Sequence, residues 1–225
     1  MKTKEFFSLT ETKMKVGFFN TIEYAKTIIW YYPKWAFAQV DLYLLSRYLW
    51  KNPFKISKEF MAQRGEDDVH VYGETPLTTL DKIATECQLS TMDTVFELGC
   101  GRGRTCFWLN AFIGCRVVGV DFIPEFIQIA QEAEVRFDLH NVKFRLEDIV
   151  KTDLTGATVI YLYGTCLKDE EIRSLIQNFK KLHRGTKIIT VSYSLKDYDP
   201  ECPFEVIKRF PARFTWGETD VYMHM

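Results

Sequence analysis

The sequence lacks the cysteine and histidine clusters that usually hold metal ions. Its six cysteines include no C-x-x-C pair, and its four histidines are scattered along 225 residues. A zinc site needs its ligands close together, so we expect free thiols and no metal. Internal repeats and low-complexity stretches are also absent, and the chain length suits one α/β domain with a full core.

A secretory signal and a membrane-spanning segment are missing as well. The start, MKTKEFFSLTETK, has no continuous apolar region. Residues 18–50 are rich in apolar side chains, but Pro33 interrupts them and the second half contains Asp41 and Arg47. A bilayer-spanning helix needs roughly 20 apolar residues with few charges. We therefore predict a cytoplasmic protein that is at most peripheral to a membrane.

Neither sign of charge is in excess overall. The net charge is −1, and we expect no nucleic-acid partner. The distribution is uneven, because residues 1–64 hold 11 Lys and Arg against 5 Asp and Glu, together with 15 of the 34 aromatic residues. We predict a basic, aromatic-rich helical extension over 1–64, a polar linker at 63–68 and a main domain over 65–225.

The extension is predicted to contain two helices, separated at Pro33, because proline removes a backbone donor and disfavours helix just before it. Two arrangements remain open. In the one we favour, the helices pack onto the main domain as a cap, since apolar helix faces are usually buried. In the other, they lie on a membrane surface with their aromatic side chains inward and four cations near the headgroups: Lys26, Lys34, Arg47 and Lys51.

From residue 69 onward, strand-like apolar runs alternate with helical patterns. This alternation predicts an α/β fold with a mostly parallel sheet and helices on both faces. Thr75 is expected to cap the first of these helices and Pro76 to begin it. Strands are predicted at 93–98, 115–121, 142–148, 157–163 and 186–193, helices at 76–87, 104–112, 124–137 and 168–183, and two further strands within 213–225.

The stretch VFELGCGRGR ends the first strand in three glycines, Gly99, Gly101 and Gly103. Ligands of open α/β sheets bind at the carboxyl ends of the strands, so we expect these glycines to let a ligand approach the backbone. A dinucleotide site needs G-x-G-x-x-G, but Arg104 stands at the place of its third glycine. Glu97 would repel a pyrophosphate and attract an ammonium group.

The E-x-G-x-G-x-G pattern resembles motif I of the class I S-adenosylmethionine (SAM)-dependent methyltransferases, and SAM carries an ammonium group but no phosphate. The resemblance implies a Rossmann-like fold, with a mostly parallel seven-stranded sheet and an antiparallel C-terminal strand. It also implies an acid after the second strand that binds the ribose hydroxyls, which is Asp121, with Phe122 beside the adenine. Asp148 and Ile149, after the third strand, would meet the adenine amino group. We therefore predict SAM as the cofactor.

HVYGETP, residues 70–76, resembles the V-Y-G-E-T loop of the non-SET histone-lysine methyltransferases of the telomeric-silencing-disruptor type. The likeness extends over residues 69–225 and is shared more loosely with small protein-lysine methyltransferases. In that family the loop closes over the methionine end of SAM, and FTWGETDVYM resembles its closing strand pair, whose Trp lines the lysine channel. The resemblance implies cofactor contacts for Tyr72, Gly73, Glu74 and Thr75, and places in the channel for Trp216 and Tyr222.

Two departures from that family point away from histones. Tyr163-Gly164-Thr165 replaces its N-N-F after the fourth strand, and a basic tail that would hold nucleosomal DNA is absent. Tyr163, Trp216 and Tyr222 are predicted to line an apolar channel that favours a neutral lysine by desolvation. We predict methyl transfer to a lysine of a non-histone protein. A methyltransferase for small or lipid-like acceptors and a catalytically silent SAM-binding module stay open as alternatives.

Overall fold

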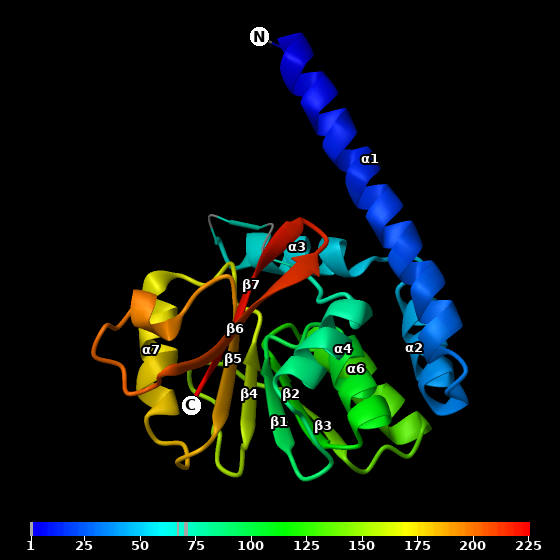
Figure 1. Ribbon diagram of the computed structural model, residues 1–225. Helices are drawn as coiled ribbons and strands as arrows, with labels where there is room; N and C mark the ends of the chain where they lie inside the picture. The colour runs from blue at the N-terminus through cyan, green and yellow to red at the C-terminus, as the bar shows by residue number, and fades with distance from the viewer. Residues whose placement is uncertain (1, 67, 70–71) are drawn as a thin grey trace.

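One seven-stranded sheet forms the centre of the protein (Figure 1). The computed structural model describes residues 2–66, 68–69 and 72–225, with side chains from residue 14 onward, so His70 and Val71 of the HVYGETP motif lie outside the described residues. The strand order is β3-β2-β1-β4-β5-β7-β6, and β7 runs antiparallel to both of its neighbours. The strands are β1 (Thr94–Leu98), β2 (Arg116–Asp121), β3 (Val142–Leu146), β4 (Val159–Leu162), β5 (Lys187–Val191), β6 (Val206–Phe214) and β7 (Gly217–His224).

Helices cover both faces of the sheet (Figure 1). The apolar core on one face includes side chains of α2, α4, α5 and α6, and the core on the other face includes those of α7. The helices are α1 (Lys2–Lys26), α2 (Trp35–Arg47), α3 (Pro53–Gln63), α4 (Leu77–Glu86), α5 (Arg104–Trp108), α6 (Pro124–Arg136) and α7 (Asp169–Phe179), with π-helical turns at Thr27–Tyr31 and Leu109–Ile113 and a 3-10 turn at Leu195–Asp197.

The predicted α/β fold, with its mostly parallel seven-stranded sheet and antiparallel C-terminal strand, is confirmed. Three details differ. Helix α3 is not among the predicted elements; Asn52 caps it by accepting the N–H of Lys55 at 2.9 Å. The last strand pair starts earlier than predicted, because β6 begins at Val206. Thr75 does not cap α4: Pro76 is the cap residue, and the Thr75 hydroxyl bonds that of Tyr161 instead.

The register of the parallel strands determines which loops meet at the carboxyl edge of the sheet. All four residues of β4 are buried, as expected for a strand covered on both faces. Leu98 at the end of β1 pairs with Leu162 at the end of β4. The glycine turn after β1 and the segment that starts at Tyr163 therefore leave the sheet side by side.

The N-terminal helices differ in how closely they contact the main domain. α2 buries Phe37, Val40 and Leu44, and the Phe37 ring lies 5.5 Å from that of Phe112 in an edge-to-face contact. α1 projects away from the body (Figure 1). Within the described chain, no helix combines the length and the apolar content needed to cross a bilayer.

A buried ion pair ties α2 to the glycine turn. Arg104 donates two hydrogen bonds to the fully buried Asp41 carboxylate, at 2.6 and 2.8 Å, and the Tyr32 hydroxyl donates a third at 3.0 Å. Burial by itself raises the pKa of Asp41, but the Arg104 guanidinium outweighs it and brings this pKa below its usual value. The carboxylate is therefore charged and fully paired.

Removing one partner of this pair is expected to destabilise the protein strongly. Asp41→Ala leaves the Arg104 charge buried without a partner, which costs about 3–5 kcal/mol of unfolding free energy. Denaturant unfolding measures this loss. Arg47→Met, which removes the surface pair between Arg47 and Glu132, is the matched control and should cost about 1 kcal/mol or less. Equal losses of unfolding free energy in the two variants would contradict the structural role of the buried Asp41–Arg104 pair.

Candidate functional site

A cavity of about 430 Å³ lies at the carboxyl ends of the central strands, beside the glycine turn. This is the edge at which open α/β sheets bind their ligands. The cavity wall combines the loops after four strands with α3 and the segment before α4. Its lining includes Ser57, Met61 and Arg64 of α3, Tyr72 and Gly73, Gly99 and Gly101 after β1, residues 121–123 after β2, Asp148 and Ile149 after β3, and residues 163–168 after β4.

The three glycines of the turn have different neighbours, although all three have positive φ. A Cβ on Gly99 would meet no atom of the described residues within 4 Å, so the backbone there faces open space. A Cβ on Gly101 would lie 2.9 Å from the ring of Tyr72, and one on Gly103 would lie 2.5 Å from the ring of Phe144. Gly99 is thus open to a ligand, Gly101 lines the cavity against a tyrosine ring, and Gly103 accommodates core packing outside the lining.

Asp121 joins the glycine turn to the segment after β2. Its buried carboxylate accepts the N–H of Gly101 at 2.8 Å and the N–H of Ile123 at 2.9 Å. Burial raises the pKa of Asp121, and these backbone donors oppose the rise. A carboxylate has about four lone-pair sites, so Asp121 keeps acceptor capacity at the cavity. Phe122 follows it in the lining, with its ring 5.6 Å from that of Phe60 in α3.

Glu97 lies just inside the turn and is buried. The Thr105 hydroxyl donates to its carboxylate at 2.5 Å, and the Cys106 thiol donates at 2.9 Å. Burial raises the pKa of Glu97 to about 7, although these two donors lower it in part. A positive group placed beside this carboxylate would favour its charged form.

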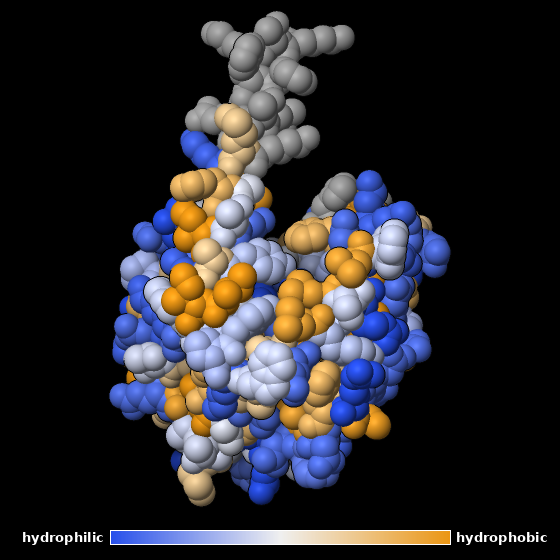
Figure 2. Space-filling model, turned by 90° about the vertical axis from the view of Figure 1, so that its right-hand side faces the viewer, coloured by the Kyte–Doolittle hydropathy of each residue, from blue (hydrophilic) through white to orange (hydrophobic). Residues whose placement is uncertain are grey.

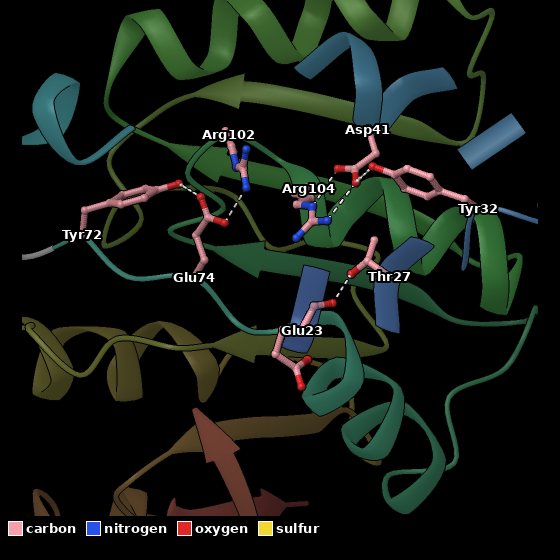
Figure 3. Close-up of polar contacts among 8 residues, drawn as sticks. All are labelled: Glu23, Thr27, Tyr32, Asp41, Tyr72, Glu74, Arg102 and Arg104. Carbon is pink, nitrogen blue, oxygen red and sulfur yellow. Dashed lines mark hydrogen bonds and ion pairs between the residues drawn. The ribbon is translucent and has the colours of Figure 1, made fainter. Parts of the chain in front are cut away.

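Tyr72 and Glu74 belong to a chain of polar contacts that also includes Arg102 (Figure 3). The Tyr72 hydroxyl donates to Glu74 at 2.6 Å, and Arg102 donates to the same carboxylate at 2.7 Å. Glu74, Thr75 and Glu97 do not line the large cavity. They line a smaller one of about 20 Å³, which shares Tyr72, Gly73, Gly99 and Tyr163 with the larger one.

Asp148 and Ile149 follow β3 and both line the large cavity. Ile149 is buried in the core on the α7 face of the sheet. Asp148 is exposed, accepts the N–H of Val150 at 3.0 Å and forms an ion pair with Lys151 at 3.4 Å. The Asp148 carboxylate therefore sits at the rim of the cavity.

Tyr163 and Trp216 come together, although 53 residues separate them. The indole N–H of Trp216 donates to the Tyr163 hydroxyl at 2.7 Å, and the Trp216 ring stacks on Phe214. Tyr163 lines both cavities. Trp216 is half exposed and contacts the site through Tyr163.

The prediction that Tyr222 lines the channel is wrong, because Tyr222 lines neither cavity. Successive residues of a strand point to opposite faces of the sheet. Val221 and Met223 of β7 belong to the core on the face that holds Tyr161, whereas Tyr222 points to the other face. There it stacks on His224 and lies 5.4 Å from the Arg209 guanidinium.

Several residues of the site are missing from the sequence-based prediction. The cavity wall from α3 and the loop over 164–168 carry no motif, and the partners of Arg102 and Arg104 are distant in sequence. Two arginines within a glycine turn and a single aspartate in the apolar run around Asp41 are the signals that could have indicated buried ion pairs.

Comparison with known proteins agrees with this geometry. The sequence model of the ANTKMT methyltransferase domain matches residues 97–202, which begin at Glu97 and include the loops after β1 to β5. This match covers just under half of the chain, and together with the fold it supports a class I SAM-dependent methyltransferase domain. An RNA methyltransferase from Salinibacter ruber, solved with S-adenosyl-L-homocysteine, has the same fold: its TM-score is 0.54 at 22% identity, covering 67% of this chain and 91% of that one.

Two curated relatives are methyltransferases of lysine. The histone H3 lysine-79 specific N-methyltransferase of Dictyostelium discoideum is 28% identical over 165 residues, which is 67% of this chain but only 9% of that protein's length. The protein-lysine N-methyltransferase of Saccharolobus islandicus is 25% identical over 142 residues, covering 61% of this chain and 83% of the relative.

SAM is the cofactor of this methyltransferase, and the residues present fit it. The open backbone at Gly99 admits a ligand, Asp121 has acceptor capacity at the cavity, and the Glu97 carboxylate suits an ammonium group. A nucleotide with a pyrophosphate would place its negative charge beside two buried carboxylates, which is unfavourable.

The raised pKa of Glu97 predicts a pH-dependent stability. Unfolded glutamate loses its proton near pH 4.5, while folded Glu97 keeps it to about pH 7. Between these values the folded state binds more protons, so the unfolding free energy falls as pH rises, by about 1.4 kcal/mol per unit. Glu97→Gln should remove this decline in denaturant titrations from pH 5 to 8. Glu218→Gln, at an exposed position, is the control and should keep the decline of the wild type. If the unfolding free energy of Glu97→Gln falls as steeply with pH as that of the control, the raised pKa of Glu97 is contradicted.

Proposed function

We propose that this methyltransferase transfers the methyl group of SAM to a lysine side chain of a non-histone protein. The observation that carries the proposal is the Tyr163–Trp216 pair at the end of β4, which adjoins the cofactor cavity. The lysine specificity named for the Dictyostelium and Saccharolobus relatives supports it. The charge of the main domain, −7 over residues 65–225 (−1 in total less +6 for 1–64), is unsuited to nucleosomal DNA.

In this proposal the cofactor is held from three sides. Asp121 accepts hydrogen bonds from the ribose hydroxyls, and Phe122 packs beside the adenine with Asp148 and Ile149. Glu97 pairs with the ammonium group at the amino-acid end of SAM. The placement of the four adenosine-binding residues on the lining of one cavity supports these roles. Bound SAM supplies a methyl group activated by a positively charged sulfur.

The acceptor is oriented by Tyr163. Burial raises the pKa of Tyr163, so its phenol stays protonated. Its oxygen accepts the Trp216 N–H and keeps a second lone pair. That lone pair can accept an N–H of a neutral amine, which aims the amine's own lone pair at the methyl group. Alignment of this kind supplies much of the acceleration of an in-line displacement.

The size of the cavity favours a lysine over a small free acceptor. At about 430 Å³ it lies near the lower end of small-molecule sites, so a cofactor leaves little room for a second molecule. A thin alkyl chain that enters from outside fits better. Contact with aromatic rings removes water from the lysine amine, which lowers its pKa and favours the neutral, reactive form.

Labelled SAM incubated with the full-length protein and a cell lysate tests the acceptor. We expect label in the protein fraction, recovered as methyl-lysine after hydrolysis. Tyr163→Phe should lower its rate of formation by about 3- to 10-fold, the worth of one neutral hydrogen bond, without weakening SAM binding in calorimetry. Tyr198→Phe is the control, because Tyr198 ends the 3-10 turn Leu195–Asp197 and lines neither cavity.

Other outcomes separate the alternatives. Label only in organic-soluble material would contradict the lysine proposal and favour a small or lipid-like acceptor. No label in any fraction, with SAM binding intact, would favour the silent SAM-binding module.

We further propose that the extension places this enzyme on an anionic membrane surface, in a cytoplasmic compartment. Large apolar side chains gather where α1 leaves the body (Figure 2). They stay exposed on the side of the N-terminal helices away from the core, with Lys26 and Lys34 nearby. Basic helices with an aromatic and apolar face bind lipid interfaces in this way. The exposed set includes Phe18, Ile28, Ile29, Trp30, Trp35, Leu42, Leu49 and Trp50.

Co-sedimentation of the full-length protein with vesicles tests the membrane contact. We expect binding to phosphatidylglycerol vesicles that weakens with salt. Changing Ile29 and Trp30 together to Ser should reduce the bound fraction by roughly 10-fold or more, because two apolar side chains are no longer buried in lipid. Met92→Ser, which removes an exposed apolar side chain from the main domain, is the control. Equal binding by the two variants would contradict the proposed surface.

A further inference from the structure

The smaller cavity brings a cation and an acid together beside the cofactor site. Its lining includes Arg102 and Glu97, and it shares Gly99, Gly73 and two tyrosines with the large cavity. A ligand in the large cavity therefore lies next to the residues of the small one. With about 20 Å³ it has room for a water-sized group, so a small polar end of a ligand is the natural occupant.

Arg102 has an unused hydrogen-bond donor in this place. Its side chain is only 6% exposed, and its buried Nε has no hydrogen-bond partner among the residues that the structure describes. Leaving a buried N–H unpaired costs free energy, more so on a charged group. One of its other donors, Nη2, donates to Glu74 at 2.7 Å, and Tyr48 lies with its ring 5.9 Å from the guanidinium carbon. These contacts fix the guanidinium and leave Nε available.

We propose that Arg102 binds the carboxylate of the amino-acid end of SAM, while Glu97 binds the ammonium group of the same end. The pairing rests on the cofactor and not on the identity of the methyl acceptor. A zwitterion matches one buried cation and one buried acid that line the same small cavity, which has room for one of its two charged groups. A phosphate group matches them poorly, because Glu74 and Glu97 both place negative charge there.

The proposal also gives a role to Glu74, which lines the small cavity and not the large one. Burial lowers the pKa of Arg102, but Glu74, together with Tyr72 and Asp41, raises it above its ordinary value, so the guanidinium keeps its charge. Glu74 itself receives donors from Arg102 and Tyr72. Glu74 is thus a positioning residue that acts through Arg102.

Two ligands that differ only in the carboxylate test this assignment. S-Adenosylhomocysteine contains the full amino-acid end, and its decarboxylated analogue S-adenosyl-3-thiopropylamine keeps the amine alone. In calorimetry the wild-type protein should bind the first about 10- to 100-fold more tightly, as expected for a hydrogen bond between charged groups. Arg102→Met should bind both with similar affinity, and Arg102→Lys should keep part of the preference.

Controls separate recognition from folding. Arg64→Met alters the adenosine side of the large cavity and should weaken both ligands equally. The double variant Arg102→Met, Glu74→Gln removes the buried pair without leaving a lone charge, so it keeps the test available where the single variant unfolds. An unchanged preference in the folded variants, or no preference in the wild type, would overturn the assignment of Arg102. Binding of neither ligand to the wild type would overturn the cofactor site as a whole.

Discussion

Two buried ion pairs hold the glycine turn, and much of the site depends on them. Arg102 pairs with Glu74 and Arg104 pairs with Asp41, so each arginine of the turn reaches a carboxylate that precedes the sheet in sequence (Figure 3). An isolated buried charge is far costlier than a paired one. The turn, the loop before α4 and helix α2 are therefore one mechanical unit, and the N-terminal extension belongs to the architecture of the site.

This coupling changes how the extension is understood. A cap on the main domain and a membrane-facing surface are exclusive alternatives only if the helices have one apolar face. α2 has two: Phe37 and Leu44 are buried against the core, whereas Trp35 and Leu42 are exposed. The buried face also carries Asp41, which pairs with Arg104. One helix can therefore pack on the main domain and still expose apolar side chains.

Local patterns account for what the sequence predicts well. The order of strands, the glycine turn and the acid after β2 are set by residues close together in the chain, and they place Gly99 and Asp121 on the cavity. The missing parts depend on tertiary structure. The ion pairs join residues 28 and 63 positions apart. Tyr222 carries a motif match but lies on the wrong face of β7, because a strand alternates its faces and a short motif does not specify which one meets the site.

The glycine turn itself shows how a motif and a ligand are related. Gly101 and Gly103 make room for the rings of Tyr72 and Phe144, and only Gly99 of the three faces open space. Their spacing is thus evidence for the shape of a turn before it is evidence for a ligand. The charges around the turn carry the chemical information: a glutamate whose pKa is raised by burial and a guanidinium with an unused donor meet in one small cavity. Such a cavity selects a ligand that carries both signs of charge at one end, which an amino acid does and a phosphate does not.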